Sequence, residues 1–173
     1  MRLLIVSDSH GDSHILNQLV DRYQDKVDKF VHCGDSELSD RDLVWGVMDT
    51  VAGNCDYYGD FNLSHVERSL EYPYGIVHGH YHDVKWSLDK LKAFAEAEAL
   101  RFVFYGHSHI LAADYEAGVF FINPGSIKSP RGSVYEKTYC LLDATEEAVE
   151  LKVYNDKHKE IPSLGKKWTQ TEL

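Results

Sequence analysis

The chain has 173 residues, of which 43% are hydrophobic and 27% charged, and its formal net charge is -10, as in an ordinary acidic globular protein. The acidic balance argues against an extended nucleic-acid-binding surface, and no apolar run approaches the roughly 20 residues that a membrane span requires. Three cysteines without C-x-x-C spacing argue against a disulfide framework or a thiolate zinc site. We therefore expect a single domain over residues 1–173, located in the reducing cytoplasm, with neither a membrane nor an extended nucleic acid as partner.

The first part of the chain predicts strands and one helix. Residues Arg2 to Ser7 form a short apolar run typical of a buried strand, and apolar residues recur at helical spacing from Ser13 to Gln24. Two further apolar runs, Lys29 to Cys33 and Val47 to Ala52, predict strands that end at a glycine followed by a short polar residue. A β-loop-α unit followed by two strands is therefore expected.

The rest of the chain is richer in strands. Its composition predicts one helix from Ser87 to Leu100, with Ser87 as the N-cap. The tail from about residue 157 has the composition of a loosely held segment. Runs of apolar and β-branched residues predict seven more strands: His65–Tyr72, Gly75–His78, Phe102–Tyr105, Leu111–Tyr115, Val119–Ile122, Tyr139–Asp143 and Ala148–Tyr154.

Histidines gather at the ends of predicted strands. In α/β sheets, ligands bind outside the carboxyl ends of strands, so side chains distant in sequence can converge there. A Gly-Asp or Gly-Asn pair alone is typical of a simple turn, but two imidazoles two residues apart are costly to bury without a cation. Asp8, Asp35 and Asn54 stand at strand ends as well. We therefore predict one metal site. The six strand-end histidines are His10, His78, His80, His82, His107 and His109.

The order of these motifs resembles that of the calcineurin-like metallophosphoesterase superfamily, and especially its small single-domain bacterial and archaeal phosphodiesterases. The resemblance implies a four-layer α/β/β/α sandwich, in which two mixed β-sheets are flanked by helices. It also implies two divalent metal ions, with manganese as the first choice and nickel, iron or zinc as alternatives. The motifs that carry the superfamily resemblance are Asp8-Ser9-His10, Gly34-Asp35, Gly53-Asn54, His78-Gly79-His80 and Gly106-His107-Ser108-His109. Those that carry the resemblance to the small branch are Ser7-Asp8-Ser9-His10-Gly11, Gly53-Asn54-Cys55-Asp56 and Asn123-Pro124-Gly125-Ser126.

The resemblance also implies a role for each ligand. Asp8, His10 and His109 would hold one metal, and Asp35 would bridge to the second. That second site would be completed by Asn54, His78 and His107. Two adjacent cations can lower the pKa of a bridging water and clamp the oxygens of an in-line displacement, so a metal-bridging hydroxide is the expected nucleophile and a small phosphate ester the expected substrate. Asp35 and Asn54 are thus expected to act in catalysis.

Cys55 stands where larger phosphatases of the superfamily carry a histidine that protonates the leaving group. We expect Cys55 to be a small packing residue and His80 to be the proton donor. Arg131 is expected to contact substrate phosphate through its guanidinium group. A site without the usual imidazole favours phosphodiesters, or esters with acidic leaving groups, over alkyl monoesters. The histidines outside the motifs, interpreted as structural or surface residues, are His14, His32, His65 and His158.

The sequence allows two other interpretations. The run from His78 to Asp83 resembles the H-x-H-x-D-H motif of metallo-β-lactamase-type hydrolases, but its last two residues are inverted and the other motifs would have no role. The same small fold resembles the metallophosphoesterase-like subunit of the retromer coat, so a non-catalytic protein-binding scaffold is the alternative function. The presence of all seven implied ligands favours catalysis. The resemblance also allows a homo-oligomer, whereas the sequence identifies neither the substrate nor the native metal.

Overall fold

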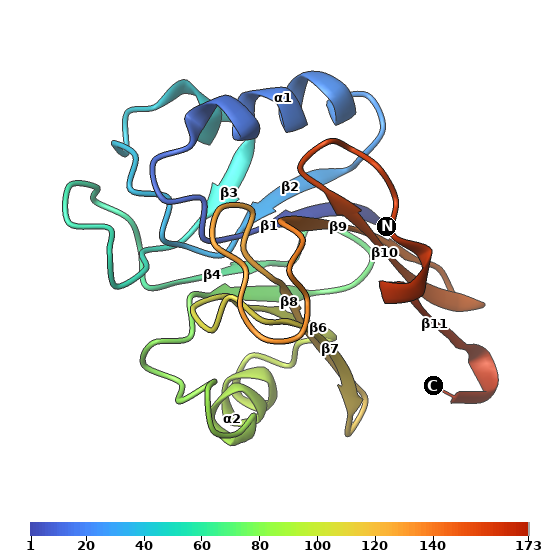
Figure 1. The fold of residues 1–173 in the computed structure, drawn as a ribbon. Helices are drawn as coiled ribbons and strands as arrows, with labels where there is room; N and C mark the ends of the chain where they lie inside the picture. The colour runs from blue at the N-terminus through green and yellow to red at the C-terminus, as the bar shows by residue number, and fades with distance from the viewer. Residues whose placement is uncertain (173) are drawn as a thin grey trace.

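Two β-sheets pack face to face between two helices in a computed structural model that describes residues 1–172 (Figure 1). One sheet has six strands in the order β11 (Lys166–Thr169), β10 (Ala148–Asn155), β9 (Thr138–Ala144), β1 (Arg2–Val6), β2 (Lys29–His32) and β3 (Met48–Thr50). The other has five strands in the order β4 (Ser64–Glu67), β5 (Tyr74–Val77), β6 (Phe102–Phe104), β8 (Val119–Pro124) and β7 (Leu111–Glu116).

The helices form the two outer layers. Helix α1 (Ser13–Tyr23) packs on the outer face of the six-stranded sheet, and helix α2 (Asp89–Ala97) packs on the outer face of the five-stranded sheet (Figure 1). Both sheets contain parallel and antiparallel pairs. The α/β/β/α sandwich with two mixed sheets is therefore confirmed. Three short 3-10 helices complete the elements: Leu43–Gly46, Pro162–Leu164 and Gln170–Glu172.

Strand β1 illustrates how the sequence builds these layers. Leu3 and Ile5 pack between the two sheets, whereas Leu4 and Val6 pack beneath helix α1. Successive side chains of a strand point to opposite faces, so a strand covered on both faces must be apolar throughout. All four side chains are fully buried. The uninterrupted apolar run in the sequence is thus the pattern of a strand between two layers.

The parallel strands determine where the polar loops meet. Strands β1, β2 and β3 are parallel to one another, and so are β5, β6 and β8. Parallel neighbours place their carboxyl ends at the same edge of a sheet. The loops that follow β1, β2, β3, β5 and β6 carry the aspartates, asparagine and histidines singled out in the sequence. The topology therefore gathers these loops at one edge of the sandwich.

The C-terminal region differs from the expected loosely held tail. Strand β11 pairs antiparallel with β10, and the ring of Trp168 lies 5.0 Å from that of Phe120, measured between centroids. Burial of the indole ring against an aromatic neighbour offsets the conformational entropy lost on ordering the segment. The expected N-cap also differs, because helix α2 begins at Asp89, whose backbone N–H is 3.3 Å from the hydroxyl of Ser87.

Charged groups join the edges of the two sheets at β3 and β4. The ammonium of Lys29 lies 3.6 Å from Asp49 of β3 and 3.2 Å from Glu67 of β4. The imidazole of His65 lies 3.7 Å from Asp49. Because the groups are half-buried, solvent screens them less than it screens exposed ion pairs. This cluster links one sheet to the other.

Two observations bear on the surroundings of the protein. Within residues 1–172, no helix combines the length and apolar character needed to cross a bilayer. All three cysteines are free, and Cys33 and Cys140 are buried. The cytoplasmic location and the single-domain organisation stay predictions.

Candidate metal centre

The loops after β1, β2, β5 and β6 bring aspartates and histidines together. His78 Nε2 lies 3.2 Å from Asp35 Oδ2, and His109 Nε2 lies 3.1 Å from Asp8 Oδ1. Asp8 Oδ1 lies 3.9 Å from the Nε2 atoms of both His10 and His78. Two sets of potential ligands result, Asp8 with His10 and His109 and Asp8 with Asp35 and His78, and within each set the ligand atoms lie within 4.8 Å of one another. The two sets adjoin because they share Asp8.

Asp35 reaches both sides of this cluster. A third set with the same spacing contains His10, Asp35 and Cys55. Burial, followed by the charge of Asp35, raises the pKa of the Cys55 thiol to about 11, so the thiol stays protonated at neutral pH. Without a bound metal, a protonated thiol contributes no thiolate to this set. Cys55 instead contributes its backbone N–H, which donates to Asp35 Oδ1 at 2.7 Å.

The other predicted site residues surround His78 and His109. Asn54 Oδ1 lies 3.1 Å from His78 Nε2, and the ring centroids of His107 and His80 lie 5.2 and 5.4 Å from that of His78. The backbone N–H of Arg131 donates to the carbonyl of His109 at 3.0 Å. The structure therefore brings the seven predicted ligands and His80 together and places Arg131 beside them. Their individual roles stay predictions.

Three histidines direct Nε2 into the cluster because their Nδ1 atoms are hydrogen-bonded to oxygen acceptors outside it. A carbonyl oxygen only accepts hydrogen bonds, so an Nδ1 that faces a carbonyl must carry the hydrogen. In the neutral ring, Nε2 is then left with its lone pair toward the cluster, as in metal-binding histidines whose other nitrogen is held by an acceptor. The pairs are His78 with the Cys33 carbonyl at 2.8 Å, His109 with the Ser129 carbonyl at 2.7 Å, and His10 with the Glu37 carboxylate at 2.5 Å.

The carboxylate of Asp8 fits a divalent cation. Its Oδ2 atom accepts hydrogen bonds from the hydroxyl of Ser7 at 2.6 Å and from the backbone N–H of His107 at 3.2 Å. Its Oδ1 atom is buried and accepts no hydrogen bond among the described residues while the imidazole of His109, 3.1 Å away, is neutral and carries its hydrogen on Nδ1. Burial raises the pKa of Asp8, but the contacts with His109 and His78 outweigh burial and lower it, so the carboxylate is ionised. A buried ionised oxygen without a donor is costly, and a bound cation would remove that cost.

The backbone is strained at five of the seven predicted ligands. A left-handed backbone is rare outside glycine, costs about 1 to 3 kcal/mol per residue and is concentrated at functional sites. Surrounding contacts must hold each of these residues in place. The non-glycine ligands with positive φ are Asp8 (53°), His10 (41°), Asp35 (55°), His107 (67°) and His109 (59°).

Asp56 is a positioning residue to which the sequence assigned no role. Its carboxylate accepts hydrogen bonds from the backbone N–H groups of Asp35 at 2.8 Å, Gly53 at 2.7 Å and Glu37 at 2.7 Å, and from the hydroxyl of Ser36 at 3.3 Å. One carboxylate thereby joins the loop after β2 to the loop after β3. No spacing in the sequence signals these contacts, because their partners lie on separate loops.

His32 is fully buried beneath the same loops. Gly34 N–H donates to His32 Nδ1 at 3.1 Å, so the hydrogen of the neutral ring is on Nε2, which donates to the hydroxyl of Ser9 at 2.9 Å. Burial lowers the pKa of His32 to about 4 and keeps the ring neutral. The structural role of His32 is therefore to connect the loop of Asp8 and His10 to the loop of Asp35.

Asn123 and Ser126 hold the remaining loops. The amide of Asn123 donates to the carbonyl of Gly106 and to the hydroxyl of Ser108, each at 3.0 Å. The hydroxyl of Ser126 donates to the carbonyl of Asp8 at 2.8 Å. These contacts place the loop after β6 against the loop after β1, which brings His109 to Asp8.

Comparison with known proteins identifies the family. The model of the calcineurin-like phosphoesterase superfamily domain matches residues 1–147. The chain belongs to the calcineurin-like phosphoesterase superfamily. It is 35% identical over 169 residues to the probable metallophosphoesterase YsnB of Bacillus subtilis, which covers 98% of this chain and 99% of that protein. A crystal structure of a predicted phosphoesterase from Streptococcus pneumoniae matches with a TM-score of 0.94 and 33% identity, and covers 97% of each chain.

More distant calcineurin-like folds also match. Vps29 from Entamoeba histolytica, in a crystal structure complexed with zinc, has a TM-score of 0.71 and 18% identity and covers 98% of this chain and 99% of that chain. At this identity the likeness shows the fold alone. Membership of the calcineurin-like phosphoesterase superfamily supports a metal-dependent phosphoesterase, and the ligand sets around Asp8 fit the divalent metal that the family implies.

Metal binding to this calcineurin-like site should compete with protons. Burial lowers the pKa values of His78 and His109, but hydrogen bonds with Asp35 and Asp8 outweigh burial and raise them above their ordinary value. A proton on either imidazole blocks a cation, so affinity for Mn²⁺ should fall as the pH is lowered. In scanning calorimetry, we expect saturable stabilisation by Mn²⁺ that is larger at about pH 8 than at about pH 6. The exposed-histidine control His14→Gln should behave like the wild type, and equal stabilisation at both pH values would contradict the expectation.

Proposed function

We propose that the chain is a dinuclear-metal phosphodiesterase that hydrolyses small phosphodiesters. The observation that supports this most is the pair of adjoining ligand sets that share Asp8, with Asp35 in reach of both sides. Two divalent cations bound there would lower the pKa of a shared water and stabilise the charge that develops on the phosphoryl oxygens during an in-line displacement. Manganese is the first choice, with nickel, iron and zinc as alternatives. The proposed ligands are Asp8, His10, Asp35, Asn54, His78, His107 and His109.

Asp35 is suited to a bridging position. Its Oδ1 atom is engaged by the backbone N–H of Cys55, which leaves Oδ2 directed at His78 and the cluster. Burial raises the pKa of Asp35, but the hydrogen bond and the charge of His78 outweigh burial and hold the pKa well below its usual range. The carboxylate is therefore ionised and keeps one oxygen free for the reaction centre. Asn54 adds a neutral amide oxygen beside it without adding charge.

His80 is the proposed proton donor to the leaving group, but only a small fraction of molecules would carry its protonated form. Burial, followed by the charge of His78, lowers the pKa of His80, and bound cations would lower it further. Most molecules would therefore carry a neutral His80 at neutral pH. Leaving groups that need no proton should react best, which favours aryl diesters over alkyl monoesters.

Arg131 is the proposed contact for substrate phosphate. It lines a cavity of about 380 Å³ beside the metal centre together with Lys85 and Ser108. Among residues 1–172, Asp83 pairs with Lys90 and Asp12 pairs with Lys128, and no ion pair involves Arg131 or Lys85, which leaves both cations for an anion. In a chain with a net charge of -10, two such cations in one cavity beside the metal ligands favour a phosphate there.

The function can be tested with metal-stripped protein to which Mn²⁺, Ni²⁺, Zn²⁺ or Mg²⁺ is returned. We expect metal-restored hydrolysis of bis-para-nitrophenyl phosphate, with a kcat/KM at least about a hundredfold above that for glycerol phosphate. Para-nitrophenyl phosphate is a monoester with the same leaving group as the diester. Comparing the rates on these two compounds therefore shows the effect of ester class at constant leaving-group acidity. Comparable rates on the aryl diester and the alkyl monoester would contradict the proposed preference.

The alternative is a non-catalytic protein-binding scaffold. The likeness of the fold to Vps29 favours it, whereas the adjoining ligand sets formed by five of the predicted ligands favour catalysis. These five are Asp8, His10, Asp35, His78 and His109. The absence of turnover with every metal would favour the scaffold. We further propose a single domain over residues 1–173 in the cytoplasm that acts on small phosphate esters rather than on extended nucleic acids, and that has the capacity to form a homo-oligomer.

A further inference from the structure

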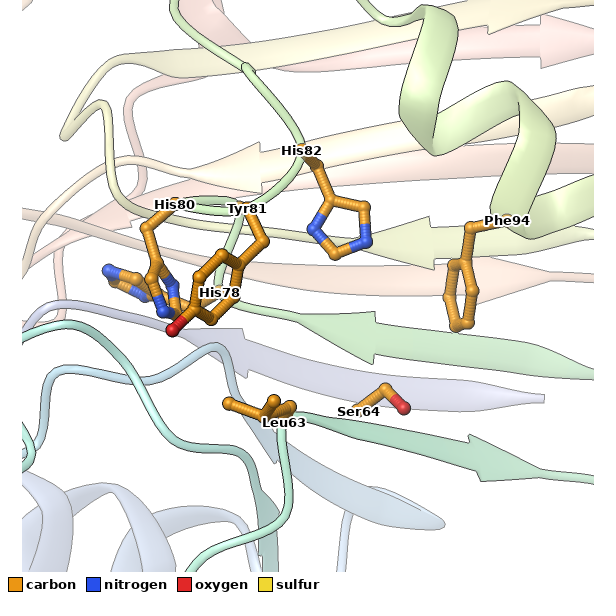
Figure 2. Close-up of a pocket in the computed structure, with 8 residues that line it drawn as sticks. Leu63, Ser64, His78, His80, Tyr81, His82 and Phe94 are labelled. Carbon is orange, nitrogen blue, oxygen red and sulfur yellow. The ribbon is translucent and has the colours of Figure 1, made fainter.

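A cavity of about 350 Å³ opens directly beside the metal centre. Its volume lies within the range typical of small-molecule sites, roughly 300 to 1,000 Å³. His78 and His80 belong both to its wall and to the metal centre, so a phosphate held by the metal ligands would have one of its ester arms at the mouth of this cavity. The other lining residues are Leu63, Ser64, Gly79, Tyr81, His82 and Phe94 (Figure 2).

Apolar and aromatic side chains make up most of the wall. Leu63 and Tyr81 are 58% and 65% exposed, although burial of side chains of this kind is favourable. In Figure 2, Tyr81 and Leu63 lie on either side of the opening and Phe94 closes the far end. The lining contains neither lysine nor arginine, so a second anionic group has no partner in it. The shape and chemistry therefore suit a flat, uncharged ring.

The polar groups of the wall suit a ring with a polar edge. Burial lowers the pKa of His82, so its imidazole is neutral and offers one donor and one acceptor nitrogen. The hydroxyl of Ser64, which lies next to Leu63 and across the cavity from His82 in Figure 2, both donates and accepts. The Nδ1 atoms of His80 and His82 are buried and have no hydrogen-bond partner among residues 1–172. Because solvent does not reach these two nitrogens, they do not face a ring in the cavity, and hydrogen bonds to its edge fall to the other polar groups of the wall.

We propose that this cavity, termed the aromatic subsite and formed by Leu63, Ser64, Tyr81, His82 and Phe94, binds a planar heteroaromatic arm of the substrate, of the size of a nucleobase, while its phosphate lies at the metal centre. The proposal rests on the phosphodiesterase function proposed above and specifies its substrate class. Aromatic rings recognise bases by stacking without strong preference for sequence, and the neutral His82 and Ser64 add hydrogen bonds to the edge of the ring.

Equilibrium binding tests the subsite without relying on turnover. Calorimetry of the Mn²⁺-loaded protein would compare adenosine monophosphate with methyl phosphate, which shares the phosphate but lacks the ring. We expect adenosine monophosphate to bind at least about tenfold more tightly. The substitutions Tyr81→Ser and Leu63→Ser should each remove most of this preference and leave the affinity for methyl phosphate unchanged. Both residues are largely exposed, so neither substitution should impair folding.

A matched control is available in Leu43→Ser, because Leu43 is 92% exposed and does not line the cavity. This variant should keep the wild-type preference for adenosine monophosphate. Equal affinities of the wild type for the two ligands, or a preference that survives both Tyr81→Ser and Leu63→Ser, would overturn the subsite. Hydrolysis of bis-para-nitrophenyl phosphate, measured on the same preparations, reports separately on the phosphodiesterase function.

Discussion

The substitution Asp35→Asn should reduce kcat/KM for an aryl phosphodiester by at least about a hundredfold and weaken the binding of Mn²⁺. Asparagine keeps the shape of the side chain and can still accept the Cys55 hydrogen bond at Oδ1, so the loop should hold its conformation. What changes is the atom that faces His78 and the cluster, where an amide donor replaces a charged oxygen. Steady-state kinetics, together with metal analysis of the purified variant, measure both effects.

A suitable control for this variant is Asp60→Asn. Asp60 is an exposed aspartate in the segment that follows β3, and it contributes no ligand atom to the sets around Asp8. It should retain wild-type kinetics and metal content. If Asp35→Asn kept both the rate and the metal, Asp35 would have no part in the reaction, and the proposed two-metal mechanism would be wrong.

Replacement of Asp56 by alanine should lower the free energy of unfolding by about 3 kcal/mol and also reduce turnover by about ten- to a hundredfold. Four donors on two loops would lose a charged acceptor. Two residues of these loops, Asp35 and Glu37, have left-handed backbones with φ values of 55° and 54°, and they relax once the acceptor is removed. Asp35 would then no longer face His78, so stability and activity should fall together.

Urea unfolding of the metal-free protein, followed by circular dichroism, measures the change in the free energy of unfolding. A lower midpoint with an unchanged slope would show a change in stability rather than in the compactness of either state. Asp60→Ala removes a carboxylate from the same segment without touching the two loops and should leave the midpoint in place. An Asp56→Ala variant with the wild-type midpoint would show that other contacts position the loops.

Local sequence determined the framework and the chemistry of the site. Strand β1 can be predicted from its apolar run because both faces of the strand are covered. Helix α1 can be predicted from its helical spacing because one face of the helix is buried. Paired imidazoles such as His107 and His109 stand out because burial of two such groups is costly without a ligand. The resemblance of the ordered motifs to one superfamily then implied the two mixed sheets, which periodicity alone does not specify.

Tertiary structure alone decided which residues support that site. Asp56 accepts a hydrogen bond from Asp35, which is 21 residues away in the sequence, and the ring of Trp168 contacts that of Phe120 on the other sheet. His32 carries no sign in its own segment that it joins two metal-binding loops. Hydrogen bonds between loops and ring contacts between sheets depend on how the layers pack against one another. The local periodicity of the sequence does not predict this packing. The sequence therefore predicted which groups would carry the chemistry, and the packing of the two sheets decided which residues hold these groups and which lie beside them.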